Sequence, residues 1–204
     1  MKSLNLILNS FKLYFFSNNA FRSIANKTSL KTTLFTLFLL NFISSAIYFF
    51  KLGDMNIVNL FLFLISVIIG TISVALTLAI IAFIIHLFYI LFKSNAKFKK
   101  MYIMFTSINI GFLILSLFIS FLYWLTIKFS DIPFILTIKI IIGFLYLMLV
   151  LWQLVINIYY IGKIQRVSTI KSFFAFLLMY LILIGIGLIF GLKTFIIANY
   201  NALI

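Results

Sequence analysis

The sequence predicts an all-α, polytopic integral membrane protein with five transmembrane helices, preceded by an amphipathic helix in the membrane interface. Two observations lead to this prediction. The 204 residues are 66% hydrophobic and 9% charged, whereas a soluble domain is about half apolar and a quarter charged. The apolar residues also gather into five long blocks between positions 31 and 193, and the gaps between the blocks carry positive charge on alternate sides.

Each block is long enough to cross a membrane, since ~20 apolar residues span a hydrocarbon core of ~30 Å. The blocks are expected to be helices because lipid offers no partner for open backbone groups. They show no polar/apolar alternation, which argues against an outer-membrane barrel. The predicted spans are residues 32–51, 57–92, 101–127, 134–160 and 172–192. Residues 31–193 form one transmembrane domain, between a cytoplasmic leader of residues 1–30 and an extracytoplasmic tail of residues 194–204.

Before the first span, residues 4–16 place apolar side chains near helical spacing, with lysine and asparagine between them. This pattern predicts a helix that lies in the interface. The alternative is an apolar leader that packs against the helix bundle.

The second block can be one long helix or two short spans that break near Gly70, because 36 residues make ~54 Å of helix. Charge decides between them. With one helix, most cations share a side with the N-terminus, and Lys51, Lys128 and Lys193 lie opposite. The positive-inside rule then predicts one unbroken helix, a cytoplasmic N-terminus and an extracytoplasmic C-terminus.

Reactive side chains are scarce, which argues against an enzyme. The sequence has no cysteine or glutamate, and its only carboxylates, Asp54 and Asp131, fall in separate outer loops. A metal site would have to combine His86 with these distant residues, and no glycine-rich phosphate loop is present. We therefore expect no catalytic residue, metal or cofactor.

The formal net charge of +14 comes from cations in loops beside the spans. Anionic lipid headgroups explain this placement better than nucleic acid, because no nucleic-acid-binding module accompanies the charge. The predicted site for anionic lipid or a protein partner comprises Lys93, Lys97, Lys99, Lys100, Arg166 and Lys171.

Polar residues inside the spans are the second candidate site. Gln153 and Asn157 share a face of the fourth span, and with Asn109 they either line a polar cavity or bond across helices. His86 is expected near the cytoplasmic interface. There it either exchanges a proton or contacts a lipid phosphate, or it forms a hydrogen bond with a neighbouring helix. Lys139 is expected to extend outward as an anchor, with Asp131 as a candidate partner.

Two stretches carry a family resemblance. One is His86-Leu87-Phe88-Tyr89-Ile90-Leu91-Phe92-Lys93 followed by Lys97-Phe98-Lys99-Lys100. The other is Val150-Leu151-Trp152-Gln153-Leu154 running to Gly162, then Ser168-Thr169-Ile170-Lys171-Ser172. Together with the five spans, they resemble the Ypt-interacting-protein (Yip) domain family over residues 10–192. The chain differs from the family at Ser94-Asn95, where a glycine pair is common. It also lacks the third-span proline and the leader signature of eukaryotic members.

The resemblance implies a bacterial-type member in the cytoplasmic (inner) membrane. The leading hypothesis is a non-enzymatic membrane-organising or interaction scaffold, with anionic lipid, a membrane protein or a second copy as partner. The alternative is a small-molecule transporter or lipid flippase with a polar track of His86, Asn109, Gln153 and Asn157. A common water-accessible cavity would favour transport, and tight pairing across helices would disfavour it.

Overall fold

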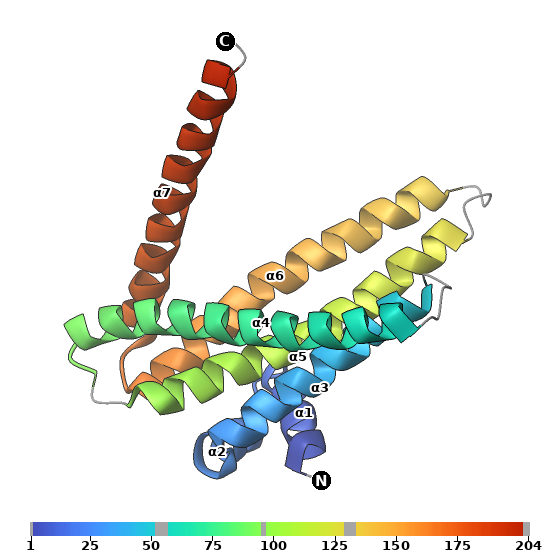
Figure 1. The fold of residues 1–204 in the computed structure, drawn as a ribbon. Helices are drawn as coiled ribbons and strands as arrows, with labels where there is room; N and C mark the ends of the chain where they lie inside the picture. The colour runs from blue at the N-terminus through green and yellow to red at the C-terminus, as the bar shows by residue number, and fades with distance from the viewer. Residues whose placement is uncertain (1, 52–56, 95–96, 129–133, 202–204) are drawn as a thin grey trace.

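The computed structural model describes residues 2–51, 57–94, 97–128 and 134–201, with side chains described in 2–46, 59–94, 97–128 and 134–188. Regular structure in these ranges is entirely helical, so the predicted all-α class is confirmed. The helices, shown in Figure 1, are α1 (Lys2–Leu13), α2 (Asn18–Lys27), α3 (Leu30–Lys51), α4 (Ile57–Leu91), α5 (Phe98–Lys128), α6 (Ile135–Gln165) and α7 (Thr169–Asn201).

Four helices in the described residues are long and apolar enough to cross a membrane: α4, α5, α6 and α7. A fifth span is reached only if α2 and α3 count as one, and these helices are bent by 114° at the break between Lys27 and Leu30. The first predicted span therefore corresponds to α3, whose described side chains end at Ala46. The helix α7 continues to Asn201, beyond the predicted end at residue 192.

The second block is one helix, as the charge pattern predicts. The helix α4 runs through Gly70 without a break. A Cβ at Gly70 would lie 3.1 Å from Nδ2 of Asn41 on α3. That Nδ2 donates hydrogen bonds to the main-chain oxygen of Val67 (3.1 Å) and to Oγ1 of Thr71 (2.9 Å). Gly70 thus allows α3 to approach α4 closely.

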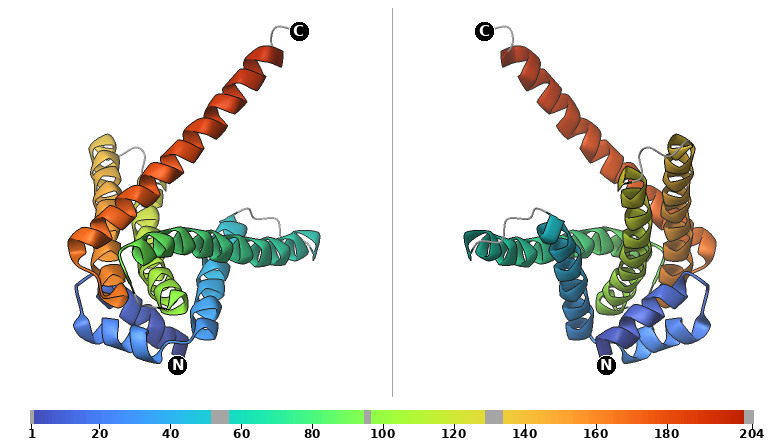
Figure 2. Two further views of the ribbon diagram at one scale, coloured as in Figure 1. Left: turned by 90° about the vertical axis from the view of Figure 1, so that its left-hand side faces the viewer. Right: turned by 90° about the vertical axis from the view of Figure 1, so that its right-hand side faces the viewer.

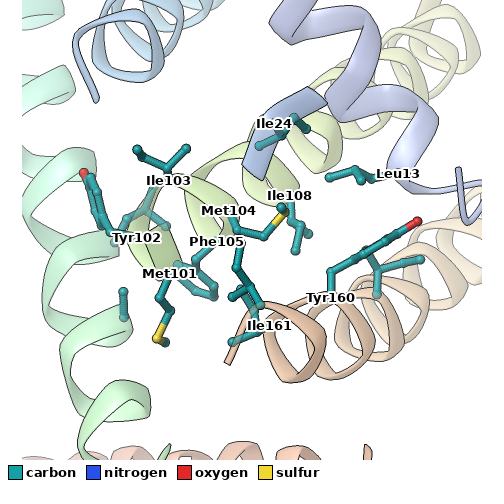
Figure 3. Close-up of a cluster of buried hydrophobic side chains, with 14 of the residues drawn as sticks. Leu13, Ile24, Met101, Tyr102, Ile103, Met104, Phe105, Ile108, Tyr160 and Ile161 are labelled. Atoms are coloured by element: carbon teal, nitrogen blue, oxygen red, sulfur yellow. The ribbon is translucent and has the colours of Figure 1, made fainter. Parts of the chain in front are cut away.

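The first half of α5 is the centre of the fold. Every residue from Met101 to Gly111 is buried except Asn109, which is half-buried. The helix contacts α1, α2, α3, α4 and α6. Figure 3 shows Leu13, Ile24 and Tyr160 converging on this segment from three other helices. The core therefore sits at one end of the bundle, the end that the charge pattern predicts to be cytoplasmic.

The far end of α7 stands away from the other helices. Figures 1 and 2 show α7 beginning beside α4 and the end of α6 and then diverging, whereas α5 and α6 run side by side. Met179 is the last buried residue among the described side chains of α7, which end at Leu188, and the large side chains at Leu181, Ile184 and Leu188 are exposed. Such extended apolar surface needs lipid or another protein to cover it.

The leader docks on the bundle by one face. Leu6, Ser10 and Leu13 of α1 are buried, whereas Leu4 and Leu8 on its other face are exposed. One side of α1 thus packs against the helix bundle, which was the alternative to a helix in the interface. Its exposed apolar side suits the membrane interface.

The turn after α1 fixes the leader to both α5 and α6. The hydroxyl of Tyr14 donates to the main-chain oxygen of Ile108 (3.1 Å), and Nε1 of Trp152 donates to the main-chain oxygen of Tyr14 (3.0 Å). Burial raises the pKa of Tyr14, so this hydroxyl keeps its proton. Phe16 packs edge-on against Trp152 and Tyr159.

The helix α2 is absent from the sequence prediction. It is short and polar, and Oγ of Ser17 caps its N-terminus by accepting a hydrogen bond from the amide of Ala20 (3.3 Å). Serine is a favoured capping residue, so Ser17 was the available sequence signal. Ala20 and Ile24 are the buried residues of α2.

Gly111→Ala tests the docking of the leader. A Cβ at Gly111 would lie 2.7 Å from the main-chain oxygen of Ser10, so α1 must shift, at a cost of about 1–3 kcal/mol. We expect faster proteolysis of the leader in detergent. Gly143→Ala is the matched control, because nothing lies within 4 Å of a Cβ there. Equal proteolysis of the two variants would contradict the tight contact.

Candidate functional site

The structure brings two basic turns together at the packed end of the bundle. One turn follows α4 and holds Lys93 and Ser94; the other follows α6 and holds Arg166. Oγ of Ser94 lies 2.9 Å from the main-chain oxygen of Gln165 and 2.5 Å from its Oε1. Lys93 and Arg166 are the immediate neighbours of these bonded residues. Cations that are about 70 positions apart in sequence therefore belong to one surface.

Both turns end their helices in the same way. The amide of Ser94 donates to the main-chain oxygen of Tyr89, and that of Val167 donates to Gly162. Lys93 and Arg166 adopt left-handed backbone conformations, with φ of 59° and 56°. This is a Schellman cap, in which glycine is the usual left-handed residue. A side chain there costs ~1 kcal/mol, and the attraction between a cation and the negative end of the helix dipole offsets ~0.3–1 kcal/mol of that cost.

The remaining cations of the predicted set are exposed at helix starts. Lys97, Lys99 and Lys100 lie at the beginning of α5, and Lys171 lies in the first turn of α7. Helix N-termini already carry partial positive charge, so lysines there add to the attraction for an anion. Together with Lys93 and Arg166, these four residues form what we call the basic surface.

Little within the chain can neutralise the basic surface. Sixteen Lys and Arg side chains face only two carboxylates in the sequence, and both Asp54 and Asp131 lie outside the described residues. Lys163 is engaged differently. Its Nζ contacts Oδ1 of Asn18 (2.8 Å) and lies 4.9 Å from the ring centroid of Phe21. This lysine therefore links α6 to α2.

His86 belongs to the joint beneath the basic surface. Its Nδ1 lies 3.3 Å from Nε2 of Gln165, and its ring packs against Phe98 with the centroids 5.6 Å apart. His86 of α4 therefore contacts both α6 and α5. Gln165, which is fully buried, connects α4, the turn after α4, and α6. Sequence reasoning missed Gln165 and Ser94, and the only available signal was their position beside cations.

A second joint places Lys171. Ser172 is hydrogen-bonded to the hydroxyl of Tyr89, and its Oγ donates to the main-chain oxygen of Ile158 (2.5 Å). A Cβ at Gly162 would lie 2.9 Å from the Cβ of Ser172. Gly162 thus lets the start of α7 pack directly on α6, which holds Lys171 next to the turn that carries Arg166.

The intramembrane polar residues do not form one track. Nε2 of Gln153 donates to Oδ1 of Asn109 across α5 and α6 (2.9 Å), and Nδ2 of Asn157 donates to the main-chain oxygen of Gln153 (3.0 Å). His86 bonds instead to Gln165, which lies twelve residues after Gln153 and thus ~18 Å further along α6. Three grooves in the described part are lined by other residues.

Lys139 lies apart from both groups. It is half-buried near the start of α6, at the end remote from the basic surface, and its predicted partner Asp131 lies outside the described residues. Among the described residues, no cluster of three or more His, Cys, Asp or Glu side chains could hold a metal ion.

These features define a helical, polytopic membrane protein with a joined basic surface at its packed end. No family model matches the sequence, and neither a curated protein nor a solved structure matches it.

Gln165→Leu tests the joint between the two basic turns. The change removes the side-chain partner of Ser94 and His86 inside a buried site, at a cost of about 1–3 kcal/mol. We expect a lower melting temperature in detergent. Arg166→Gly at the next position is the control, because glycine suits its left-handed backbone and should not lower that temperature. A Gln165→Leu melting temperature equal to that of the unmodified protein would contradict the proposed role of this side chain.

Proposed function

We propose that the protein is a non-enzymatic membrane scaffold of the Yip type whose basic surface binds the headgroups of anionic lipids. The observation that carries this proposal is the contact between Ser94 and Gln165. It joins Lys93 and the lysines at the start of α5 to Arg166 and Lys171, so that separate loops present their charges to one anionic layer.

The energetics suit a surface rather than a single pocket. Each lysine or arginine near an anionic membrane contributes ~1 kcal/mol, so six such residues supply substantial binding without a specific cavity. The buried joints under the turns hold the charges near one another, which lowers the entropy lost on binding. A fixed array of cations in this position would gather anionic lipid around the packed end of the bundle.

The other functions have less support. Transport needs polar groups that face a shared cavity, whereas Asn109 and Gln153 bond to each other across helices. Catalysis needs reactive groups that converge, and the described hydrogen bonds of His86 lead to Gln165. The Yip resemblance supports the scaffold through the long α4, its basic loop and the turn between α6 and α7.

Lys99→Gln/Lys100→Gln tests lipid binding by the basic surface. Removing two cations worth ~1 kcal/mol each should lower the preference for phosphatidylglycerol over phosphatidylcholine roughly 30-fold. Native mass spectrometry of detergent-solubilised protein titrated with each lipid measures this preference. Lys128→Gln/Lys139→Gln removes the same charge at the other end of α5 and α6, and should leave the preference unchanged. An equal loss in both variants, or none in the first, would refute the proposal.

The proposed orientation places the basic surface in the cytoplasm of a bacterial cell. Because the sequence has no cysteine, single cysteines report on it directly. We expect an impermeant maleimide to label Ile127→Cys in intact cells, whereas Asn19→Cys and Ser168→Cys should react only after permeabilisation. All three positions are exposed. Labelling of Asn19→Cys and Ile127→Cys from the same face would exclude this orientation.

A further inference from the structure

An apolar groove runs along the contact between α3 and α4. Its wider part, about 480 Å³, lies between α3, α4 and the start of α5, within the ~300–1,000 Å³ typical of ligand sites. A narrower part of about 230 Å³ lies between α3 and α4. Phe98 and Tyr102 of α5 line the wide part.

The two parts follow one seam. Their lining residues recur every four positions on each helix: Leu30, Leu34, Phe38 and Phe42 on α3, and Leu64, Ile68, Ile72 and Leu76 on α4. Residues four apart lie on the same helix face. From Leu30 to Phe42 the seam extends ~18 Å at ~1.5 Å per residue. One leaflet of a ~30 Å hydrocarbon core is ~15 Å deep, so the length of the seam is similar to that of the acyl chains in one leaflet.

The groove is shaped for hydrocarbon. Val67, which is 1% exposed, lines its narrow part, and the walls at Leu34, Ile72 and Leu76 are exposed. The polar groups beside it already have partners. Oγ1 of Thr71 bonds to Asn41, and the hydroxyl of Tyr102 donates to the main-chain oxygen of Ala75 (3.2 Å). A site without open polar groups does not retain ordered water.

Positive charge lies at one end of the groove. Lys31 is three residues before Leu34 and seven before Phe38, so it lies on the groove side of α3. Lys97 and Lys99 flank Phe98 at the start of α5. All three lysines are exposed, and the sequence has only two carboxylates for sixteen cations. The charged end of the groove therefore complements an anionic group.

We propose that this acyl groove holds one chain of an anionic phospholipid, with its headgroup phosphate beside Lys31 and the lysines at the start of α5. The inference rests on the proposed function, because it assigns a defined position to one lipid gathered by the basic surface. Lys31 does not belong to the basic surface, so the groove can be tested separately.

Photo-crosslinking in nanodiscs tests the groove with the full-length protein. The probe is phosphatidylglycerol with a diazirine in one acyl chain, and phosphatidylcholine with the same chain is the comparison. We expect phosphatidylglycerol to label Ile68, Ile72 and Leu76 preferentially over the exposed α6 residues Leu147 and Leu151, while phosphatidylcholine labels both groups alike. Inorganic phosphate should not compete, because it has no chain to occupy the groove.

Two variants, each with a control variant, locate the lipid. Leu76→Trp fills the groove and should abolish the preferential labelling, whereas Leu87→Trp, on an exposed α4 residue outside the groove, should preserve it. Lys31→Gln should reduce the labelling about fivefold, the equivalent of ~1 kcal/mol, and Lys12→Gln on α1 should not.

Two outcomes would overturn the inference: uniform labelling of the exposed apolar surface, or competition by inorganic phosphate. If groove labelling is uniform while Lys99→Gln/Lys100→Gln still lowers the preference for phosphatidylglycerol, the groove assignment fails and the basic surface stands.

Discussion

The close packing around the first half of α5 is the constraint on which the other arrangements depend. Between helices in a membrane, lipid supplies no hydrophobic driving force, so association relies on packing and hydrogen bonds. From Met101 to Gly111 this helix is surrounded by α1, α2, α3, α4 and α6. Gly111 admits the leader, as Gly162 admits α7. Beyond this segment α7 diverges from the other helices, and the long helices expose apolar side chains to lipid.

Hydropathy and charge predicted most of the helices because both patterns reflect whether a segment lies in lipid or in water. Neither pattern indicates which helices pack against one another. Apolar length located α3 to α7, and the side of the cations established that α4 is unbroken at Gly70. Neither signal detects α2, since a short polar helix has no lipid-facing stretch and depends on Ser17 and the burial of Ile24. The sequence offered docking of α1 only as one of two alternatives, because the contact depends on the absence of a Cβ at Gly111, far away in sequence.

The sequence predicted the charged residues of the candidate site but not the hydrogen bonds that join its turns. Positive-inside reasoning identified Lys93 and Arg166, but a hydrogen bond between residues 71 positions apart has no sequence signal. Gln165 therefore went unnoticed, although it bonds to both Ser94 and His86. For Gln153 the periodicity gave the helix face, and the structure gave Asn109 as the partner. The bond between them accounts for both side chains without a polar cavity.

The polar joints and the cations lie at the same end of the molecule for one physical reason. Hydrogen bonds among Tyr89, Ser172 and Ile158, and among Ser94, Gln165 and His86, replace the water that these groups lose on burial. That exchange allows the helix ends to be packed where the membrane meets water. Close packing there in turn brings loops with the same charge together. The described residues include no carboxylate, so the repulsion among these cations is relieved by counter-ions from elsewhere. Under the proposed function, lipid phosphates of the membrane are those counter-ions.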